Sequence, residues 1–242
     1  CSNLSSVTLP TSLTFLRPYV FNRCSSLTSI TLPNDLTSVG NSAFGFCTSL
    51  TNITLPGSVK YIENYAFYSC LNFTSITLPE GLISIGNYAF CGCTGLTSIT
   101  LPNSLTSIGS YAFDYCTSLT NIKIPDSITT ISRGMFIGCT ALTTITLPDG
   151  LLSIGEIAFR NCTSLITIVL PNSITSIGQS AFDNCIGLKN IVIPNSVISM
   201  GSYAFDDCTS LTIYAEATSK PSNWDPKWNP LNRPVVWEYS NR

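Results

Sequence analysis

A phenylalanine recurs at intervals of 23 residues through most of this 242-residue chain. The series runs without a gap through Phe44, Phe67, Phe90, Phe113, Phe136, Phe159, Phe182 and Phe205. Such a strict period predicts a solenoid, in which each repeat forms one coil and packs only on its neighbours. The length alone would suggest one or two globular domains, but the period instead predicts a rod of stacked coils.

Each repeat contains two apolar pairs that predict short extended segments. In the fullest copy, Ile99 and Leu101 alternate with serine and threonine, the period-two signature of a strand with one buried face. Pro102 follows this strand and ends it, because proline has no N–H to donate to a ladder. The second pair, Leu105 and Ile108, predicts another extended segment on a different side of the coil.

The last part of each repeat predicts a short helical turn. Phe113 and Cys116 follow Ala112 by one and four residues, which places the three side chains on one inward side of such a turn. Glycine opens the turn in most copies and three other residues replace it: Gly40, Gly86, Gly109, Gly155, Gly178 and Gly201, against Arg17, Glu63 and Ser132.

The unit L-x-x-I-x-L-P-x-x-L-x-x-I-G-x-x-A-F-x-x-C-x-x resembles the BspA-like class of leucine-rich repeats, found on bacterial and protozoan surface proteins. The resemblance covers residues 1–214 in about nine coils. It implies an α/β solenoid, a right-handed superhelix of short parallel strands and short helical turns. Ordinary leucine-rich repeats carry Asn or Cys three residues after the last strand leucine, an offset that here falls in the post-proline turn. We therefore expect another group to satisfy the backbone at that corner.

The period fails after Tyr214, and residues 215–242 contain all three tryptophans of the chain. A stack of coils ends in an apolar cross-section that needs a terminal cap. We therefore divide the chain into a solenoid, residues 1–214, and a Trp-rich C-terminal cap, residues 215–242. A separate aromatic binding module is the alternative interpretation of the tail.

Composition limits the functions that the chain can perform. Charged residues make up 10% and the formal net charge is −2, which excludes a disordered tail and gives no basic footprint for nucleic acid. No apolar run approaches the roughly 20 residues of a membrane span, so no membrane insertion is expected. The chain has no histidine, the commonest general base and metal ligand, and no G-x-S-x-G motif. We therefore expect no catalysis and no cofactor.

Cysteine also follows the period, at Cys1, Cys24, Cys47, Cys70, Cys93, Cys116, Cys139, Cys162, Cys185 and Cys208. Coils about 4.8 Å apart bring neighbouring cysteines within disulfide distance, but side chains in register do not give the required dihedral of about 90°. Buried free thiols are therefore favoured over disulfides, and zinc is disfavoured because no CxxC occurs. Cys91 lies outside the period; we expect it to be exposed and to be the reactive thiol.

One stacked set of acids occurs near the C-terminus. Asp183 precedes Asp206 by one period, with Asn184 before Asp207 in the same way and Arg160 one coil away. Two carboxylates about 5 Å apart could bind Ca²⁺ with water. A solvated polar turn is the simpler interpretation, so we assign no metal and keep Asp183 and Asp206 as a calcium candidate.

The exposed positions of the repeat, or exposed offsets, are the remaining candidates for a functional site. Most of them vary only among Ser, Thr and Asn, which gives a smooth polar sheet. Eight aromatic or basic residues in the first five coils break this rule and are the candidate partner-binding strip: Phe15, Arg17, Tyr19, Lys60, Tyr61, Tyr65, Tyr88 and Tyr111. Exposed Tyr and Arg are typical interface anchors, although ordinary packing along a turn is the alternative.

The favoured function is a non-catalytic extracellular binding or adhesion module; a passive spacer is the alternative. By resemblance, its partners would be extracellular-matrix proteins, or proteins or glycans of a host or another cell, and its location the cell surface. We expect any signal segment or anchor to lie outside the residues given. Asn3, Asn52, Asn72 and Asn161 begin N-x-S/T sequons, which matter only in a host that glycosylates.

Overall fold

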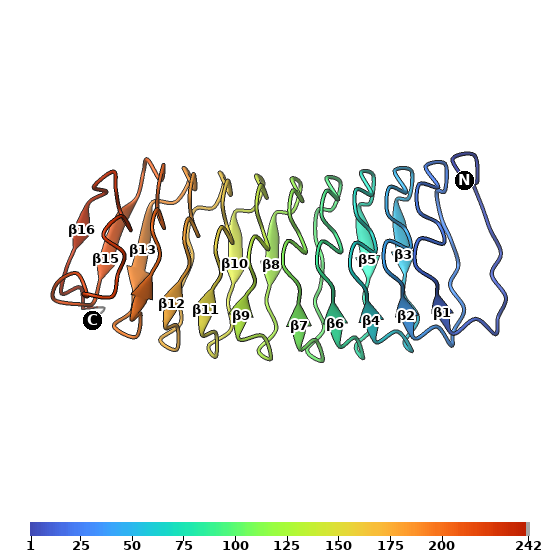
Figure 1. Ribbon diagram of the computed structural model, residues 1–242, viewed down its shortest axis with the longest axis horizontal. Coiled ribbons are helices and arrows are strands. Elements are labelled where there is room, and N and C mark those ends of the chain that lie inside the picture. The colour runs from blue at the N-terminus through green and yellow to red at the C-terminus, as the bar shows by residue number, and fades with distance from the viewer. Residues whose placement is uncertain (241–242) are drawn as a thin grey trace.

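The computed structural model describes residues 1–240 and shows one elongated stack of about ten coils (Figure 1). The N-terminus lies at one end of the stack and the described C-terminal residues at the other. The predicted parallel solenoid is confirmed. Each coil has three sides, which we name the first β-face, the second β-face and the turn face, in the order in which the chain reaches them after each cysteine of the ladder.

The two β-faces form the two rows of arrows in Figure 1. The first β-face consists of β3 (Asn52–Thr54), β5 (Ser75–Thr77), β8 (Asn121–Lys123), β10 (Thr144–Thr146), β13 (Asn190–Ile193), β15 (Thr212–Ala215) and β16 (Val235–Val236). The second β-face consists of β1 (Phe15–Leu16), β2 (Ser38–Val39), β4 (Tyr61–Ile62), β6 (Ser84–Ile85), β7 (Ser107–Ile108), β9 (Thr130–Ile131), β11 (Ser153–Ile154), β12 (Ser176–Ile177) and β14 (Ser199–Met200). All pairings are parallel, and most join residues one period apart, as in Ile85 with Ile108.

The second β-face is divided between β7 and β9 into sheets of five and four strands. In the coil before the break, the N–H of Gly109 donates to the carbonyl of Ile85 at 2.8 Å. At the break, the hydroxyl of Ser132 donates to the carbonyl of Ile108 at 2.7 Å instead. The residue that replaces the usual glycine therefore coincides with the interruption of the sheet.

The turn face contains no helix in the described residues, so the predicted helical turn is wrong. Every second N–H crosses to the next coil, as from Phe44 to the carbonyl of Ala66 at 2.8 Å. The N–H groups between them close short turns, as from Cys47 to Phe44 at 3.1 Å. Two residues of each coil lie in the left-handed region, which a helix would not allow. The apolar side chains still point inward, which is why their spacing resembled that of a helix.

The core is a set of ladders that run the length of the stack. From Phe21 to Phe205, ring centres of successive phenylalanines are 5.3–5.6 Å apart. Leucine and isoleucine from both β-faces and the alanine and cysteine of the turn face surround these rings and are buried. Each buried phenylalanine contributes about 1.5–3 kcal/mol of transfer free energy, so the ladders favour stacking over any isolated coil.

Serine satisfies the corner after the proline. The Oγ of Ser58 lies 2.6 Å from the carbonyl oxygens of both Asn34 and Leu36 in the preceding coil. Ser173 repeats this arrangement with Asp149 and Leu151. These hydroxyls provide the alternative hydrogen bonds that the absence of an asparagine ladder required.

The C-terminal segment adds a further turn to the stack. Strand β16 pairs with β15, and Trp228 lies one period after Phe205 with its ring centre 6.2 Å from that phenylalanine. Trp224 and Trp228 are buried in the same core, and the indole N–H of Trp224 donates to the carbonyl of Val197 at 3.1 Å. Residues 241 and 242 of the predicted cap lie outside the described residues.

Candidate functional site

The turn face carries tyrosines in an unusual backbone conformation. Tyr19, Tyr65, Tyr88, Tyr111 and Tyr203 have φ between 55° and 60°. Bulky residues seldom adopt this conformation, and it persists only when the surroundings impose it. Here the hydrogen bonds to the next coil impose it: the N–H of Tyr65 donates to Asn87 at 2.9 Å and that of Tyr88 to Ser110 at 3.0 Å. The ladder thus holds each tyrosine at the same height on the face.

Three of these tyrosines form a stack. Ring centres are 4.9 Å apart between Tyr65 and Tyr88 and 4.7 Å apart between Tyr88 and Tyr111, with rings within 5° of parallel. The Nε of Arg133 donates to the Oη of Tyr111 at 2.9 Å, which raises the pKa of the guanidinium above its ordinary value. Arg133 also forms an ion pair with Glu156. The stack therefore ends in a solvent-exposed charged pair.

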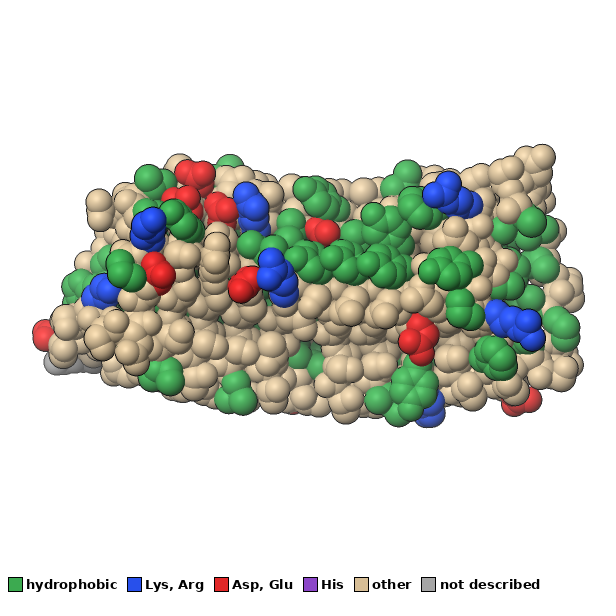
Figure 2. All heavy atoms as spheres, in the orientation of Figure 1, with side chains coloured by type: hydrophobic (Ala, Val, Ile, Leu, Met, Phe, Trp, Pro, Cys, Tyr) green, Lys and Arg blue, Asp and Glu red, His purple; other side chains and the backbone are tan. Residues whose placement is uncertain are grey.

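The stack extends in the other direction through two more rings. Tyr68 packs edge-on against Tyr65 at 5.7 Å, and Phe46 packs edge-on against Tyr68 at 5.2 Å. The guanidinium carbon of Arg23 lies 5.1 Å from the centre of the Phe46 ring. We call Phe46, Tyr68, Tyr65, Tyr88 and Tyr111 the aromatic row. Figure 2 shows side chains of this kind in a line across the middle of the molecule, with a basic and then an acidic side chain at one end.

The predicted strip is brought together only in part. Phe15 and Tyr61 lie on the second β-face and are both exposed, but Ser38 lies between them in the ladder. Tyr19 is exposed on the turn face, and Ser42 occupies the next position at its offset. The eight residues therefore divide between two adjacent sides, with Tyr65, Tyr88 and Tyr111 in mutual contact: Phe15, Arg17, Lys60 and Tyr61 at the second β-face, and Tyr19, Tyr65, Tyr88 and Tyr111 on the turn face.

Sequence reasoning missed Phe46, Tyr68, Arg23 and Arg133. It followed the offsets of the second segment and the start of its turn, whereas Phe46 and Tyr68 lie at the end of the repeat. Their identities contained a usable signal, since aromatic residues are uncommon at these two offsets near the periodic cysteine. Nothing in the sequence showed that both offsets face the same side, because the turn was expected to be helical.

The periodic thiols are buried along the inner side of the turn face. From Cys47 to Cys208, each periodic Sγ lies 3.0–3.2 Å from the carbonyl oxygen of a phenylalanine 26 residues earlier. Burial raises the pKa of the Cys47 and Cys93 thiols to about 12. These protonated thiols act as core side chains that each satisfy one carbonyl.

Cys91 is buried, with 7% of its surface exposed, so its expected exposure is wrong. Its Sγ lies 3.6 Å from Oδ2 of Asp114, and burial together with that carboxylate raises the pKa of the thiol. The same environment raises the pKa of Asp114 to about 6, because burial outweighs the bonds from Cys91 and the N–H of Tyr115. A protonated buried thiol is a poor nucleophile, and we withdraw Cys91 as the reactive cysteine. The exposed cysteine is Cys1.

The acidic group near the C-terminus does form. Ligand oxygens of Asp183, Asp206 and Asp207 lie within 4.8 Å of one another. Asp183 is already paired, with Oδ2 2.9 Å from the Nε of Arg160. Burial nevertheless raises the pKa of Asp183, and the neighbouring acids add to the effect while Arg160 opposes it. An ordinary charged surface turn would have the same arrangement of acids. The cluster contains no further feature that indicates a bound ion.

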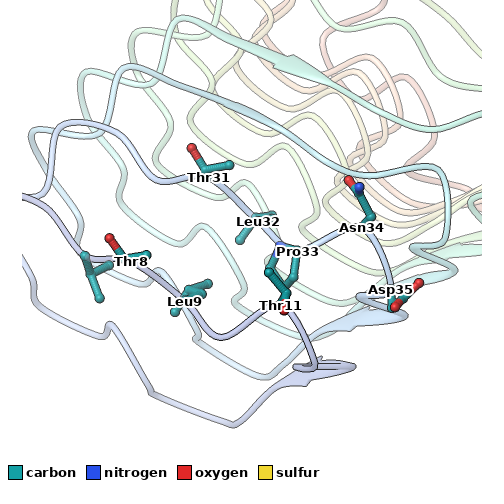
Figure 3. Close-up of a pocket in the computed structure, with 9 residues that line it drawn as sticks. Thr8, Leu9, Thr11, Thr31, Leu32, Pro33, Asn34 and Asp35 are labelled. Atoms are coloured by element: carbon teal, nitrogen blue, oxygen red, sulfur yellow. The ribbon is translucent and has the colours of Figure 1, made fainter.

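Two hollows of the surface lie on the first β-face, away from the aromatic row. One has a volume of about 520 Å³ and is formed where the first coil meets the second, around Thr8, Leu32 and Asp35 (Figure 3). Another, of about 390 Å³, lies beside Val169 near Asp149 and Glu216. These shallow spaces adjoin segments 29–31 and 167–169, which do not join the strand ladder. They contain no arrangement of a nucleophile and a base.

Comparison with protein families tests the family resemblance that the repeat implied. The model described as BspA type leucine rich repeat region matches residues 1–94 and 83–212, in six copies. This chain belongs to the BspA-type leucine-rich-repeat family. The BspA-type repeat is thus the coil with two β-faces and a turn face described above. No curated protein matches the chain.

Three bacterial leucine-rich-repeat proteins of known structure are similar to this chain. A leucine-rich repeat protein from Bacteroides ovatus has a TM-score of 0.75 at 26% identity; the match covers 96% of this chain and 66% of that protein. The leucine-rich repeat protein TpLRR of T. pallidum has a TM-score of 0.62 at 28% identity, covering 76% of this chain and 78% of that one. A leucine rich cell surface protein from Faecalibacterium prausnitzii has a TM-score of 0.52 at 25% identity, covering 98% and 80%.

The chain thus spans less than two thirds of the Bacteroides ovatus protein's length. Within residues 1–240, no helix is long and apolar enough to cross a membrane.

Proposed function

We propose that this chain is a non-catalytic binding module displayed at a cell surface, and that its exposed aromatic residues contact the partner. The observation that carries the proposal is where the repeat changes. Buried offsets keep the same residue types from coil to coil, while Phe15 and Tyr61 are exposed aromatics where the other copies have serine or threonine. Tyr19 and Tyr65 are exposed aromatics at an offset that five copies fill with tyrosine. Exposed tyrosines of this kind supply most of the binding energy in many interfaces.

The partner class follows from the family and from the surface. One solved relative, from Faecalibacterium prausnitzii, is named a cell surface protein. We propose matrix proteins, or proteins and glycans of other cells, as partners.

A passive spacer is the second candidate function. It is favoured by the first β-face, where the outward positions form an almost uniform polar sheet, as at Thr31, Thr54, Thr77 and Thr100.

A binding screen separates the two candidates. The chain would be tested by surface plasmon resonance against immobilised matrix proteins and glycans. The double variant Tyr61→Ala, Tyr65→Ala should weaken the binding by tenfold or more if each anchor contributes about 1–3 kcal/mol. The matched control, Thr31→Ala with Thr100→Ala on the first β-face, should bind as the parent does. A spacer would bind nothing in the screen, and an interface elsewhere would leave the tyrosine variant unaffected.

A further inference from the structure

We propose that the aromatic row docks an extended peptide segment of about seven residues, apolar along its middle and acidic at the end that meets Arg23. The inference rests on the proposed binding function and names the chemistry of the partner. It depends on the length of the row, the orientation of its rings and the charges at its two ends.

The row is long and one ring wide, and at Tyr68 it passes from the offset of Tyr65 to that of Phe46, four residues later in the repeat. From the coil of Arg23 to the coil of Arg133 there are five steps along the stack, which at about 4.8 Å per coil is about 24 Å. An extended peptide rises about 3.3 Å per residue, so about seven residues span this distance. The two hollows described above lie on the first β-face, so a partner of the row lies along the surface and is not enclosed.

The orientation of the rings favours a peptide over a sugar. Tyr88 has a parallel ring on each side, so its two faces are covered by Tyr65 and Tyr111. Such a stack presents hydroxyl groups and ring edges, which carry the positive part of the aromatic quadrupole. Edges and hydroxyls suit the carbonyl oxygens of a peptide backbone and its apolar side chains. Stacking on a sugar ring would need the open faces that the middle of this row does not offer.

The two ends of the row differ in charge. Arg23 is exposed beside Phe46, and it belongs to neither of the ion pairs of the described residues, Arg133–Glu156 and Arg160–Asp183. Arg133, at the opposite end, is balanced by Glu156. The cationic end is therefore the Arg23 end, and a partner gains from an acidic residue there and not at the other end.

A charge exchange tests the proposal. The probes are two fluorescent eight-residue peptides with leucine at alternating positions and either glutamate or lysine as the terminal residue, measured by anisotropy at low salt. The parent protein should bind the glutamate probe at least tenfold more tightly than the lysine probe. Arg23→Glu should reverse this preference, and Arg23→Gln should abolish it. Lys123→Glu, an equal charge change on the exposed first β-face, should leave the preference intact.

The aromatic contribution has its own readout. Tyr65→Ala should weaken both probes about equally, because it removes apolar contact and leaves Arg23 in place. An unchanged probe preference in Arg23→Glu would overturn the inference, as would binding by a sulfated linear glycan and not by either peptide. If the matrix screen finds a partner that requires Tyr61 and Tyr65 while both probes fail to bind, the peptide inference fails and the binding function stands.

Discussion

Arg133 donates a hydrogen bond to the hydroxyl of Tyr111, 22 residues earlier in the chain and one coil away in the stack. The residues on either side of Arg133 also depart from the repeat. Ser132 replaces a glycine and coincides with the break of the second β-face, and Gly134 replaces a tyrosine. One tripeptide therefore lies at the break of the sheet, at the end of the aromatic stack and at the start of the charged half of the turn face.

Gly134→Ala should destabilise the protein and displace Tyr111. Gly134 has φ of +60°, and a Cβ there would lie 2.4 Å from Cε1 and 2.5 Å from Cδ1 of the Tyr111 ring. The strained backbone and the clash should together cost about 1–3 kcal/mol of unfolding free energy. Chemical denaturation measures the cost, and near-ultraviolet circular dichroism reports the displaced tyrosine. Gly150→Ala, where no atom lies within 4 Å of the added Cβ, is the control; equal stability of both variants would contradict the expectation.

In the native protein, Cys1 should be the thiol that an alkylating reagent modifies quickly. The other ten cysteines are buried, and a thiol reacts as its thiolate. Burial raises the pKa of Cys47 and Cys93 to about 12, so almost none of either is thiolate at pH 8. Under denaturing conditions without reductant, all eleven should react. Mass spectrometry reads both states; disulfides between consecutive periodic cysteines, or rapid native modification of Cys91, would contradict this.

Asp114 should make stability depend on pH. Its pKa rises from 3.8 to about 6 on folding, so between these values the folded state holds a proton that the unfolded state has lost. Stability contributed by the protonated carboxyl is therefore present below pH 3.8 and is lost as the pH rises through about 6. Asp114→Asn should raise the melting temperature at pH 7.5 and change it little at pH 3.5. The exposed Asp126→Asn is the control, and an equal effect of Asp114→Asn at both pH values would exclude the mechanism.

The sequence predicts the ladders of this fold because close packing leaves them no freedom. Each coil must fill the same slice of core, so Phe113 and Leu105 reappear in every copy as phenylalanine and a similar aliphatic residue. The two extended segments and the proline that ends the first were predictable for the same reason. The turn face was not, since Ala112, Phe113 and Cys116 point inward in a helical turn and in the observed alternating backbone alike. Hydrogen bonds between coils decide between the two, and their partners lie a full period away.

The residue types of the candidate site could be predicted from the sequence, but their arrangement in space could not. That Tyr65, Tyr88 and Tyr111 share an offset was evident, and they do stack. That Phe46 joins them through Tyr68 depends on how far each ring leans toward the next coil, which no spacing specifies. The error at Cys91 has a similar origin, because its offset is only half-buried in most coils and becomes buried here beside Asp114.

Removing residues 215–242 should destabilise the whole stack, because this segment covers its last coil. Trp224 and Trp228 retain only 2% and 5% exposure, and their removal would expose the rings and aliphatic side chains around Phe205. In a repeat array, stability is a sum over neighbouring coils, so loss of the terminal contact lowers it throughout.

A point variant separates capping from simple loss of chain. Trp228→Ala should cost about 3–5 kcal/mol, the usual range for truncating a buried tryptophan, whereas Val236→Ser on the exposed side of β16 should cost little. Thermal melting and analytical ultracentrifugation provide the measurements: the truncated chain should melt at a lower temperature and associate through the exposed coil. A truncated chain that stays monomeric and melts with the parent would show that the tail does not cap the stack, and would return it to the alternative of a separate aromatic binding module.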